Sequence, residues 1–436
     1  MKKILFLLAL AMAFASCSES VEQPKDILNE SPRLSKYRSV EDAIEIAGKV
    51  LATEDVGSRS GVALKSVDCA HIIVGAQSRS GDADTLLYAL DIEDDGGFVL
   101  VAAPKGVEPI MAIIDSGSYS DSENQDNEAY QETLNFIKNY VSTQSASGTN
   151  GLPLIPDPDL PLLPIFKVLE YYDTIKVNRV HEPLVEIAWA QRWPENIYAP
   201  NGVAGCVPVA IAQALATMEK PDYITYTFPE KDIDAETLNW KEIKKHKHSS
   251  EAYWCTECSA TQSIHNTIGR IIREIGHLAN CEYADDGKSS VVTGMYIEDI
   301  INKYTGIKPY DRQGVLSSLF SDIDYYGGLA IVDYRRLGNI KLGHTFIADG
   351  TKNIEYTIIR HYLDDSDSNV YNTEYIIHEK TNLIHYNWGW GGSCNGWFNL
   401  DAVQPRNATE YDFSYEFNYS SNEYDKSTIL YWYYKI

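Results

Sequence analysis

The stretch from Ser142 to Pro164 limits how this chain can fold more than any other part of its sequence. It is rich in Ser, Gly and Pro, and its prolines are Pro153, Pro156, Pro158, Pro161 and Pro164. Such a composition buries little apolar surface, and Pro lacks the amide hydrogen that helices and sheets need. A chain of 436 residues is also too long for one compact core. We therefore predict two folded units joined by a linker over residues 143–184.

The residues before the linker have the pattern of a small α+β domain, which we place at 39–142. An apolar stripe at helical spacing runs from Val40 to Ala52, with Ser39 as a candidate N-cap. Short apolar runs separated by Asp- and Gly-rich turns predict strands, and an acidic helix is expected over 121–142. The runs are 71–74, 86–90, 98–102 and 110–114.

Residues 185–436 have the pattern of a second, larger domain in which helices come first and strands follow. Helices are expected at 206–219, 264–279 and 297–304. Strands are expected at 329–333, 345–348, 356–361, 375–378, 383–387 and 397–400. This order predicts an α+β fold with a helical half and an antiparallel sheet half, and not a doubly wound parallel sheet.

The first residues have the features of an export signal. Two lysines precede a short apolar run, 4–14, and small residues precede Cys17. The arrangement resembles a bacterial lipoprotein signal, although Phe14 stands where Leu is usual, which leaves simple secretion open. We predict a signal peptide at 1–17, lipidation at Cys17 and a polar tether at 18–38. The protein is expected in the cell envelope or secreted, with the lipid as its one membrane attachment before maturation.

The charge of the chain argues against a nucleic acid partner. Asp and Glu number 62 against 37 Lys and Arg, and the formal net charge of −25 repels phosphate backbones.

The cysteines argue only weakly for a metal. Cys255 and Cys258 form one CxxC pair, and His265, His277 and Cys281 follow it, but a second ligand pair is missing. A disulfide or thiols are favoured there, and we predict no metal and no cofactor.

One thiol occupies a position suited to chemistry. Gly202 and Gly205 precede Cys206, and Pro208 is tolerated only in the first turn of a helix, so the helix begins at about Cys206. Unpaired backbone amides and the helix dipole at such an end favour the thiolate, which is the nucleophilic form. The alternative is a small buried Cys without a chemical role.

A cysteine nucleophile needs a histidine as its proton carrier, and His344 is the best candidate. It follows Gly343 at the start of an alternating apolar segment, about 140 residues after Cys206, a spacing typical of papain-like enzymes. His385 is the rival, and we expect it to pack or bond locally within a strand. His246 lies in a Lys-rich stretch and is expected in polar surroundings.

The segment from Asn387 to Phe398 is the third candidate part of the active site, after Cys206 and His344. Its glycines permit a tight loop between two strands, and Trp388 and Trp390 can exclude water from an ion pair. A neutral amide or an indole can orient an imidazolium. Taken alone, the segment also fits an aromatic hairpin that only packs.

Together these segments resemble the streptopain family of cysteine peptidases, which has a papain-like fold. The matching segments are Gly205-Cys206-Val207 before Ala212-Gln213, Gly343-His344-Thr345-Phe346 before Asp349-Gly350, and His385 to Gly392 with Gly396-Trp397-Phe398. Trp189-Ala190-Gln191 is also similar to a family stretch, and residues 97–102 are similar to a strand of the family's inhibitory propeptide.

The resemblance implies a role for each matching residue. Cys206 is the nucleophile and His344 the proton carrier, with no cofactor. Trp388 stands where papain-like relatives place the Asn that orients the His, and Asn387 is the neighbouring candidate. Trp390 shields the pair, and Gln191 is a candidate oxyanion donor. The chain departs from the family at Pro208-Val209, at Thr345, and in an insertion from Thr351 to Thr381.

The resulting prediction is a secreted cysteine endopeptidase made as a zymogen. Its partners are protein or peptide substrates and its own propeptide, residues 39–142, which acts as an intramolecular inhibitor. Two alternatives remain open: a Cys–His amidase or acyltransferase acting on cell-wall peptides, and a surface binding protein that keeps the fold without turnover.

Overall fold

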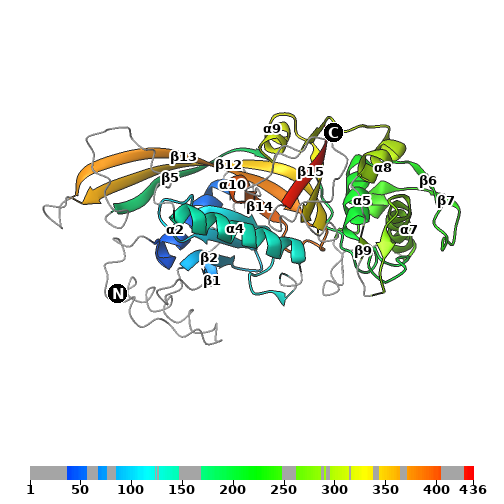
Figure 1. Ribbon diagram of the computed structural model, residues 1–436, viewed down its shortest axis with the longest axis horizontal. Helices are drawn as coiled ribbons and strands as arrows, with labels where there is room; N and C mark the ends of the chain where they lie inside the picture. The colour runs from blue at the N-terminus through cyan, green and yellow to red at the C-terminus, as the bar shows by residue number, and fades with distance from the viewer. Residues whose placement is uncertain are drawn as a thin grey trace, which may run out of the picture. The chain divides into compact units, whose positions relative to one another are not determined.

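The computed structural model describes most of both predicted domains (Figure 1). The described residues are 37–55, 67–75, 85–122, 124, 127–146, 168–247, 262–285, 289–290, 295–313, 316–336, 343–363, 371–403 and 427–436. They divide into two compact units. Unit 1 comprises Met1–Asp121, Leu134–Asn178 and Asn353–Thr381, and unit 2 comprises Ser122–Thr133, Arg179–Lys352 and Asn382–Ile436.

Unit 1 contains the elements that the N-terminal sequence predicts. Helix α2 (Val40–Asp55) precedes four antiparallel strands, β1 (Val67–Val74), β2 (Thr85–Ile92), β3 (Phe98–Ala102) and β4 (Ile110–Ile114). Ser39 and Asp42 form a capping box, because the Asp42 amide donates to Ser39 Oγ at 3.1 Å and the Ser39 amide donates to Asp42 Oδ2 at 3.0 Å. The α+β prediction for this part of the chain is confirmed.

The predicted boundaries of the tether and of the acidic helix are wrong. Arg38, placed in the tether, is buried and donates hydrogen bonds to the carbonyl oxygens of Ala102, Pro104 and Val107. Helix α4 runs from Glu128 to Ala146 and so starts later than expected. Asn127 caps it, because the amide of Tyr130 donates to Asn127 Oδ1 at 3.0 Å.

The predicted linker, 143–184, also contains a strand. Residues 168–181 form β5 (Val168–His181), which pairs with β12 (Gly343–Leu363). The Pro-rich composition ends at Pro164, and the following residues are rich in β-branched and aromatic side chains, which favour a strand. Residues 147–167 lie outside the described residues.

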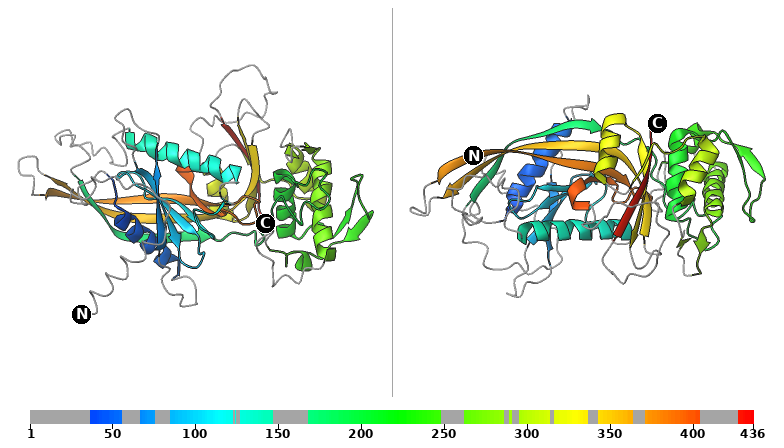
Figure 2. Two further views of the ribbon diagram at one scale, coloured as in Figure 1. Left: turned by 90° about the horizontal axis from the view of Figure 1, so that it is seen from below. Right: turned by 45° about the horizontal axis from the view of Figure 1, so that its top comes forward.

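Much of the stretch from Thr351 to Thr381, which the resemblance gives as an insertion, lies in two long strands. The two strands expected at 345–348 and 356–361 are one strand, β12, and those expected at 375–378 and 383–387 are also one, β13 (Tyr371–Asn387). The ends of β12 and β13 near their connection, Asn353–Thr381, belong to unit 1, whereas their other ends belong to unit 2. Figure 2 shows both strands as long continuous ribbons.

Unit 2 has the helical part and the antiparallel sheet that the sequence predicts. Its helices are α5 (Cys206–Met218), α6 (Trp240–Ile243), α7 (Gln262–Leu278), α8 (Met295–Thr305), α9 (Leu316–Tyr326) and α10 (Leu400–Val403). Its sheet contains β10 (Asp311–Gln313), β15 (Ser427–Tyr434), β11 (Leu329–Arg336), β12, β13 and β14 (Gly396–Asn399), in that spatial order starting from β10. Two short hairpins, β6–β7 (Tyr223–Thr225, Ala235–Thr237) and β8–β9 (Glu282–Tyr283, Ser289–Ser290), complete it. The prediction of an α+β fold with a helical half and an antiparallel sheet half is confirmed.

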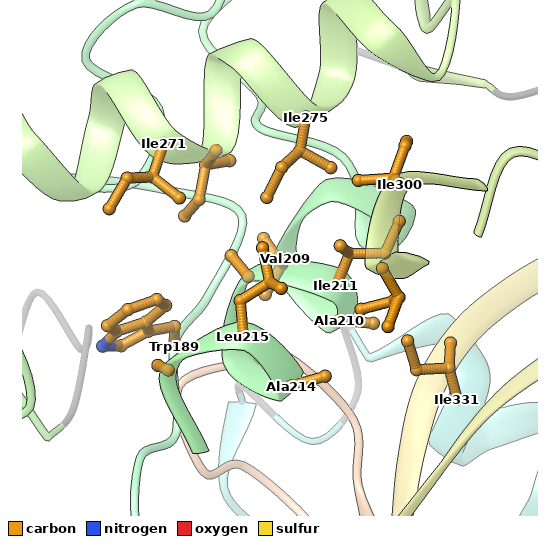
Figure 3. Close-up of a cluster of buried hydrophobic side chains, with 14 of the residues drawn as sticks. Trp189, Val209, Ala210, Ile211, Ala214, Leu215, Ile271, Ile275, Ile300 and Ile331 are labelled. Atoms are coloured by element: carbon orange, nitrogen blue, oxygen red, sulfur yellow. The ribbon is translucent and has the colours of Figure 1, made fainter. Parts of the chain in front are cut away.

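Helix α5 lies at the centre of the unit 2 core. Its residues from Val207 to Ala216 are all buried, and Trp189, Ile271 and Ile331 surround it (Figure 3). Apolar side chains on all faces of a helix favour complete burial. Because the whole helix is held by packing, the position of its first residue, Cys206, is also fixed.

The predicted export signal and Cys17 lie outside the described residues. Within the part of the chain that the structure describes, no helix is both long enough and apolar enough to cross a membrane.

Candidate active site

Cys206 is the first residue of α5, as the sequence predicts. Gly205 caps the helix with φ 95° and ψ 142°, a backbone conformation that side chains strongly disfavour. The amides of Cys206 and Val207 lie in the first turn, where helical amides have no carbonyl partner within the helix. The thiol is partly buried. A thiolate at this end is stabilised by the helix dipole.

One face of α5 carries Cys206, Val209 and Gln213, because these residues follow a spacing of three and four. The loop after β13 packs against this face. Gly389 has φ +71°, and a β-carbon there would lie 3.2 Å from Val209 Cγ1. The loop that starts at Trp388 is therefore held on the same side of the helix as the thiol.

His344 is buried near the start of β12, and its Nε2 atom lies 2.7 Å from the carbonyl oxygen of Trp388. A carbonyl oxygen can only accept a hydrogen bond, so Nε2 carries the hydrogen and donates it. Nδ1 is then the ring nitrogen that can gain or lose a proton. The hydrogen bond to the backbone of Trp388 thus holds the imidazole in one orientation.

Aromatic rings surround the imidazole. Phe346 lies nearly parallel to it with ring centroids 6.2 Å apart, and Trp388 and Trp390 lie at 6.5 and 6.4 Å. Trp388 is fixed at two points, since its indole Nε1 donates to Cys394 O at 2.8 Å and its amide donates to Asn395 Oδ1 at 3.0 Å. An apolar, dehydrated wall strengthens an ion pair formed beside it. Trp390, the predicted shielding residue, is one of the three rings beside the imidazole.

Asn387 makes its hydrogen bonds elsewhere. Its Nδ2 donates to the carbonyl oxygen of Ile187 at 2.8 Å, and its Oδ1 accepts from the Gly389 amide at 3.2 Å and from Gln213 Nε2 at 3.5 Å. These bonds tie the loop after β13 to α5 and to the segment before Trp189. The hydrogen bond that orients His344 comes from the neighbouring residue.

Gln191 lies close to the start of α5 along the backbone. Its carbonyl oxygen accepts from the amide of Ala204, two residues before Cys206, at 2.8 Å. The segment that carries it is also tied to α5, because the Trp189 amide donates to Gln213 Oε1 at 3.0 Å. These contacts hold the backbone of Gln191 near the start of α5.

His246 is buried, although it lies in a Lys-rich stretch of the sequence, and its neighbour is a carboxylate. Its Nε2 lies 3.4 Å from Glu195 Oε1, and both side chains are almost fully enclosed. The indole Nε1 of Trp189 donates to the His246 carbonyl oxygen at 2.8 Å. The sequence did not indicate this burial, because the flanking lysines are typical of an exposed stretch.

His385 on β13 bonds to Asp349 on the neighbouring strand β12, and not within its own strand as expected. Its Nδ1 lies 2.6 Å from Asp349 Oδ1, and Asp349 Oδ2 accepts from the Val185 amide at 2.8 Å. Within the described residues, no group of three or more His, Cys, Asp and Glu is arranged to hold a metal ion. Cys255 and Cys258 lie outside those residues.

Sequence reasoning missed one set of contacts. Residues 122–133, before the predicted linker, belong to unit 2. There the Ser393 hydroxyl donates to Asn124 Oδ1 at 3.0 Å, and Asn127 Nδ2 donates to the Ser393 carbonyl oxygen at 3.3 Å. The hydroxyl of Tyr334, which pairs with His344 across β11 and β12, donates to Glu132 at 3.3 Å. No local pattern in the sequence indicates these contacts.

Known proteins resemble this chain over most of its length. Residues 187–398 match the model of the Peptidase C10 family. Streptopain from Streptococcus pyogenes is 24% identical over 349 residues, which cover 73% of this chain and 75% of streptopain, and the serotype M1 protein is 23% identical over the same shares. A prointerpain A fragment from Prevotella intermedia covers 83% of this chain and 98% of its own at 16% identity and a TM-score of 0.47. Active interpain A from the same organism covers 59% and 95% at 17% identity and a TM-score of 0.36.

Taken with the geometry above, the sequence matches identify the protein as a cysteine-type endopeptidase. The match of residues 187–398 to the Peptidase C10 family model confirms the resemblance to the streptopain peptidases.

Proposed function

We propose that Cys206 and His344 are the catalytic pair of a secreted endopeptidase that is made as a zymogen. The observation that carries the assignment is the hydrogen bond from His344 Nε2 to the Trp388 carbonyl oxygen, because it leaves Nδ1 as the proton-exchanging atom. A second support is the position of the thiol at the start of α5. The substrate is a protein or peptide, and no cofactor takes part.

The reaction is acyl transfer to water in two halves. The Cys206 thiolate attacks the peptide carbonyl carbon, and the backbone amide of Cys206, with Gln191 as second donor, stabilises the oxyanion. The C–N bond breaks as His344 Nδ1 gives its proton to the leaving amine. Water then attacks the thioester, His344 takes a proton from it, and the acid leaves from the sulfur.

The proposed inhibitor is the propeptide, residues 39–142, and the part that acts on the site is 122–133. Its support is the pair of bonds from Asn124 and Asn127 to Ser393, in the loop that follows Trp388. A segment held there hinders access of a substrate to the thiol until it is removed. A lipid on Cys17 would tether the propeptide to the membrane. Cleavage in the linker would then release the enzyme from this anchor.

Replacement of Cys206 by Ala tests the proposal. We expect the variant to lose both casein hydrolysis and processing of its own precursor, while a thiol-directed active-site probe labels the wild-type protein at Cys206. Retained cleavage by Cys206→Ala would contradict the assignment. A parallel digest of peptidoglycan separates the peptidase from a cell-wall amidase.

A further inference from the structure

The hairpin arm, which we define as residues 353–363 of β12 and 371–381 of β13, has one buried face. Along β12 the side chains of Ile354, Tyr356 and Ile358 are buried, whereas Glu355 between them is exposed. On β13, Ile376 is 59% exposed. This alternation is typical of a strand pair that covers a core with one face and meets solvent with the other.

The hairpin arm belongs to unit 1, whose other described residues are those of the propeptide region, 37–121 and 134–146, and the first part of β5. Burial raises the pKa of the Tyr356 hydroxyl, and among the charges that act on it Glu108 raises the pKa and Arg38 lowers it. Arg38 is bonded to the carbonyl oxygens of the propeptide, and Glu108 accepts from the Tyr140 hydroxyl of α4 at 3.0 Å. Figures 1 and 2 both show the arm running past α2.

The order of the chain places these two partners on opposite sides of the proposed cleavage. A cut between α4 and β5 leaves α2, β1–β4 and α4 on the propeptide fragment. The hairpin arm and β5 stay with the enzyme. Cleavage therefore breaks one peptide bond but leaves the packing of the arm against the propeptide intact.

We infer that the hairpin arm is a binding surface for the cleaved propeptide, so that activation needs dissociation as a second step after cleavage. The inference rests on the proposed zymogen function. Release of the propeptide would expose Ile354, Tyr356 and Ile358 to water together. Because exposure of such an apolar stripe costs free energy, it opposes release. The partner of the surface is thus residues 37–146 of the same chain.

The test uses the full chain with Cys206→Ala and a recognition sequence for an unrelated site-specific protease between Ala146 and Val168. After the chain is cut, size-exclusion chromatography at micromolar concentration shows whether the two fragments elute together. Ile358→Asp removes the buried contact, and Ile376→Asp is its matched control, because the same change is made on the exposed face. We expect the uncut chain, the cut parent and cut Ile376→Asp to elute as one species.

Cut Ile358→Asp is expected to separate, with a dissociation constant raised about tenfold or more. If this variant does not fold, the double truncation Ile354→Ala with Ile358→Ala is expected to give the same separation without a buried charge. Separation of the cut parent, or co-elution of both arm variants with unchanged affinity, would overturn the inference. Since every chain lacks the thiol, these results do not depend on whether Cys206 is the nucleophile, which casein hydrolysis tests separately.

Discussion

His344 Nε2 and the carbonyl oxygen of Trp388 lie 2.7 Å apart. The acceptor is a backbone atom, so no side-chain substitution at residue 388 removes it. What a substitution can change is the position of the carbonyl, which depends on the bonds from the Trp388 indole to Cys394 and from its amide to Asn395.

The first prediction compares the histidine with the tryptophan. His344→Ala should lower kcat by about 10⁶-fold, the order of loss measured when the histidine of a catalytic triad is removed. Trp388→Phe keeps the carbonyl but loses the indole bond to Cys394, so kcat should fall only about tenfold, the equivalent of one hydrogen bond. Steady-state cleavage of a peptide measures both values. Equal losses in the two variants would show that the indole ring itself is essential to the proton transfer.

The second prediction separates Asn387 from the catalytic pair. Because its amide holds Ile187, Gly389 and Gln213, Asn387→Ala should cost about 1–3 kcal/mol in the free energy of unfolding. At a temperature well below the melting transition, kcat should fall far less than in His344→Ala. Urea unfolding and kinetics on the same preparation check this. A loss of kcat as large as that of His344→Ala, with unchanged stability, would make Asn387 the orienting residue instead.

The parts of the site that local sequence signals determine could be predicted. Gly205 and Pro208 define the start of α5 within one turn, and the helix begins at Cys206 as expected. The position of His344 at the start of a strand follows equally from the Gly before it and the alternation after it. Both positions depend on a few neighbouring residues, so they can be predicted without knowledge of any distant contact.

The features that depend on distant partners were not predictable. A backbone acceptor such as the Trp388 carbonyl has no side-chain signature. The continuity of β12 and β13 through the stretch from Thr351 to Thr381 was not predictable, because it depends on pairing and packing that the sequence does not display. Asn124 and Asn127 meet Ser393 across more than half the chain, so no local pattern indicates them.

The third prediction concerns the glycine before the nucleophile. Gly205→Ala places a β-carbon at φ 95°, and the strain should cost about 1–3 kcal/mol or shift the start of α5. Either result misplaces the thiol, so the rate of alkylation by a thiol-directed probe should fall. Gly48→Ala is the control, because Gly48 lies in α2 with no atom within 4 Å of the added carbon. That change should leave probe labelling unaltered. Unchanged labelling of Gly205→Ala would show that the helix start tolerates a side chain.

The fourth prediction concerns pH and the turn that leads into residues 122–133. Burial alone would raise the pKa of Asp91, but hydrogen bonds from His71, Ser118 and the Tyr119 amide outweigh it and leave that pKa below its ordinary value. A carboxylate whose pKa is lower in the folded than in the unfolded chain stabilises the fold. This stabilisation is complete at pH values above the pKa of an unfolded Asp, about 4. It is lost as the pH falls through the lower pKa of the folded state.

Asp91→Asn should therefore be less stable than the parent at neutral pH, and the difference should shrink below about pH 4. Urea unfolding of the Cys206→Ala chain at a series of pH values measures the difference. Glu93→Gln changes an exposed position two residues after Asp91. This variant should show no comparable loss of stability at neutral pH. A gap for Asp91→Asn that widened on acidification would contradict this account.

The fifth prediction tests the contact between residues 122–133 and the loop after Trp388. Asn127 has two functions, since its Oδ1 caps α4 and its Nδ2 donates to the Ser393 carbonyl oxygen. Asn127→Asp keeps the cap acceptor but replaces the donor by a carboxylate oxygen, which repels the carbonyl. The precursor should then process itself about tenfold faster, with melting close to that of the parent.

Asn127→Ala serves as the comparison, because it loses both the cap and the donor. Its helix should be less stable by about 1 kcal/mol, and its processing should be at least as fast as that of Asn127→Asp. Gel analysis of precursor processing over time, with thermal melting of the Cys206→Ala versions, gives both quantities. Faster processing in Asn127→Ala alone would mean that unravelling of α4, and not loss of the bond to Ser393, frees the site.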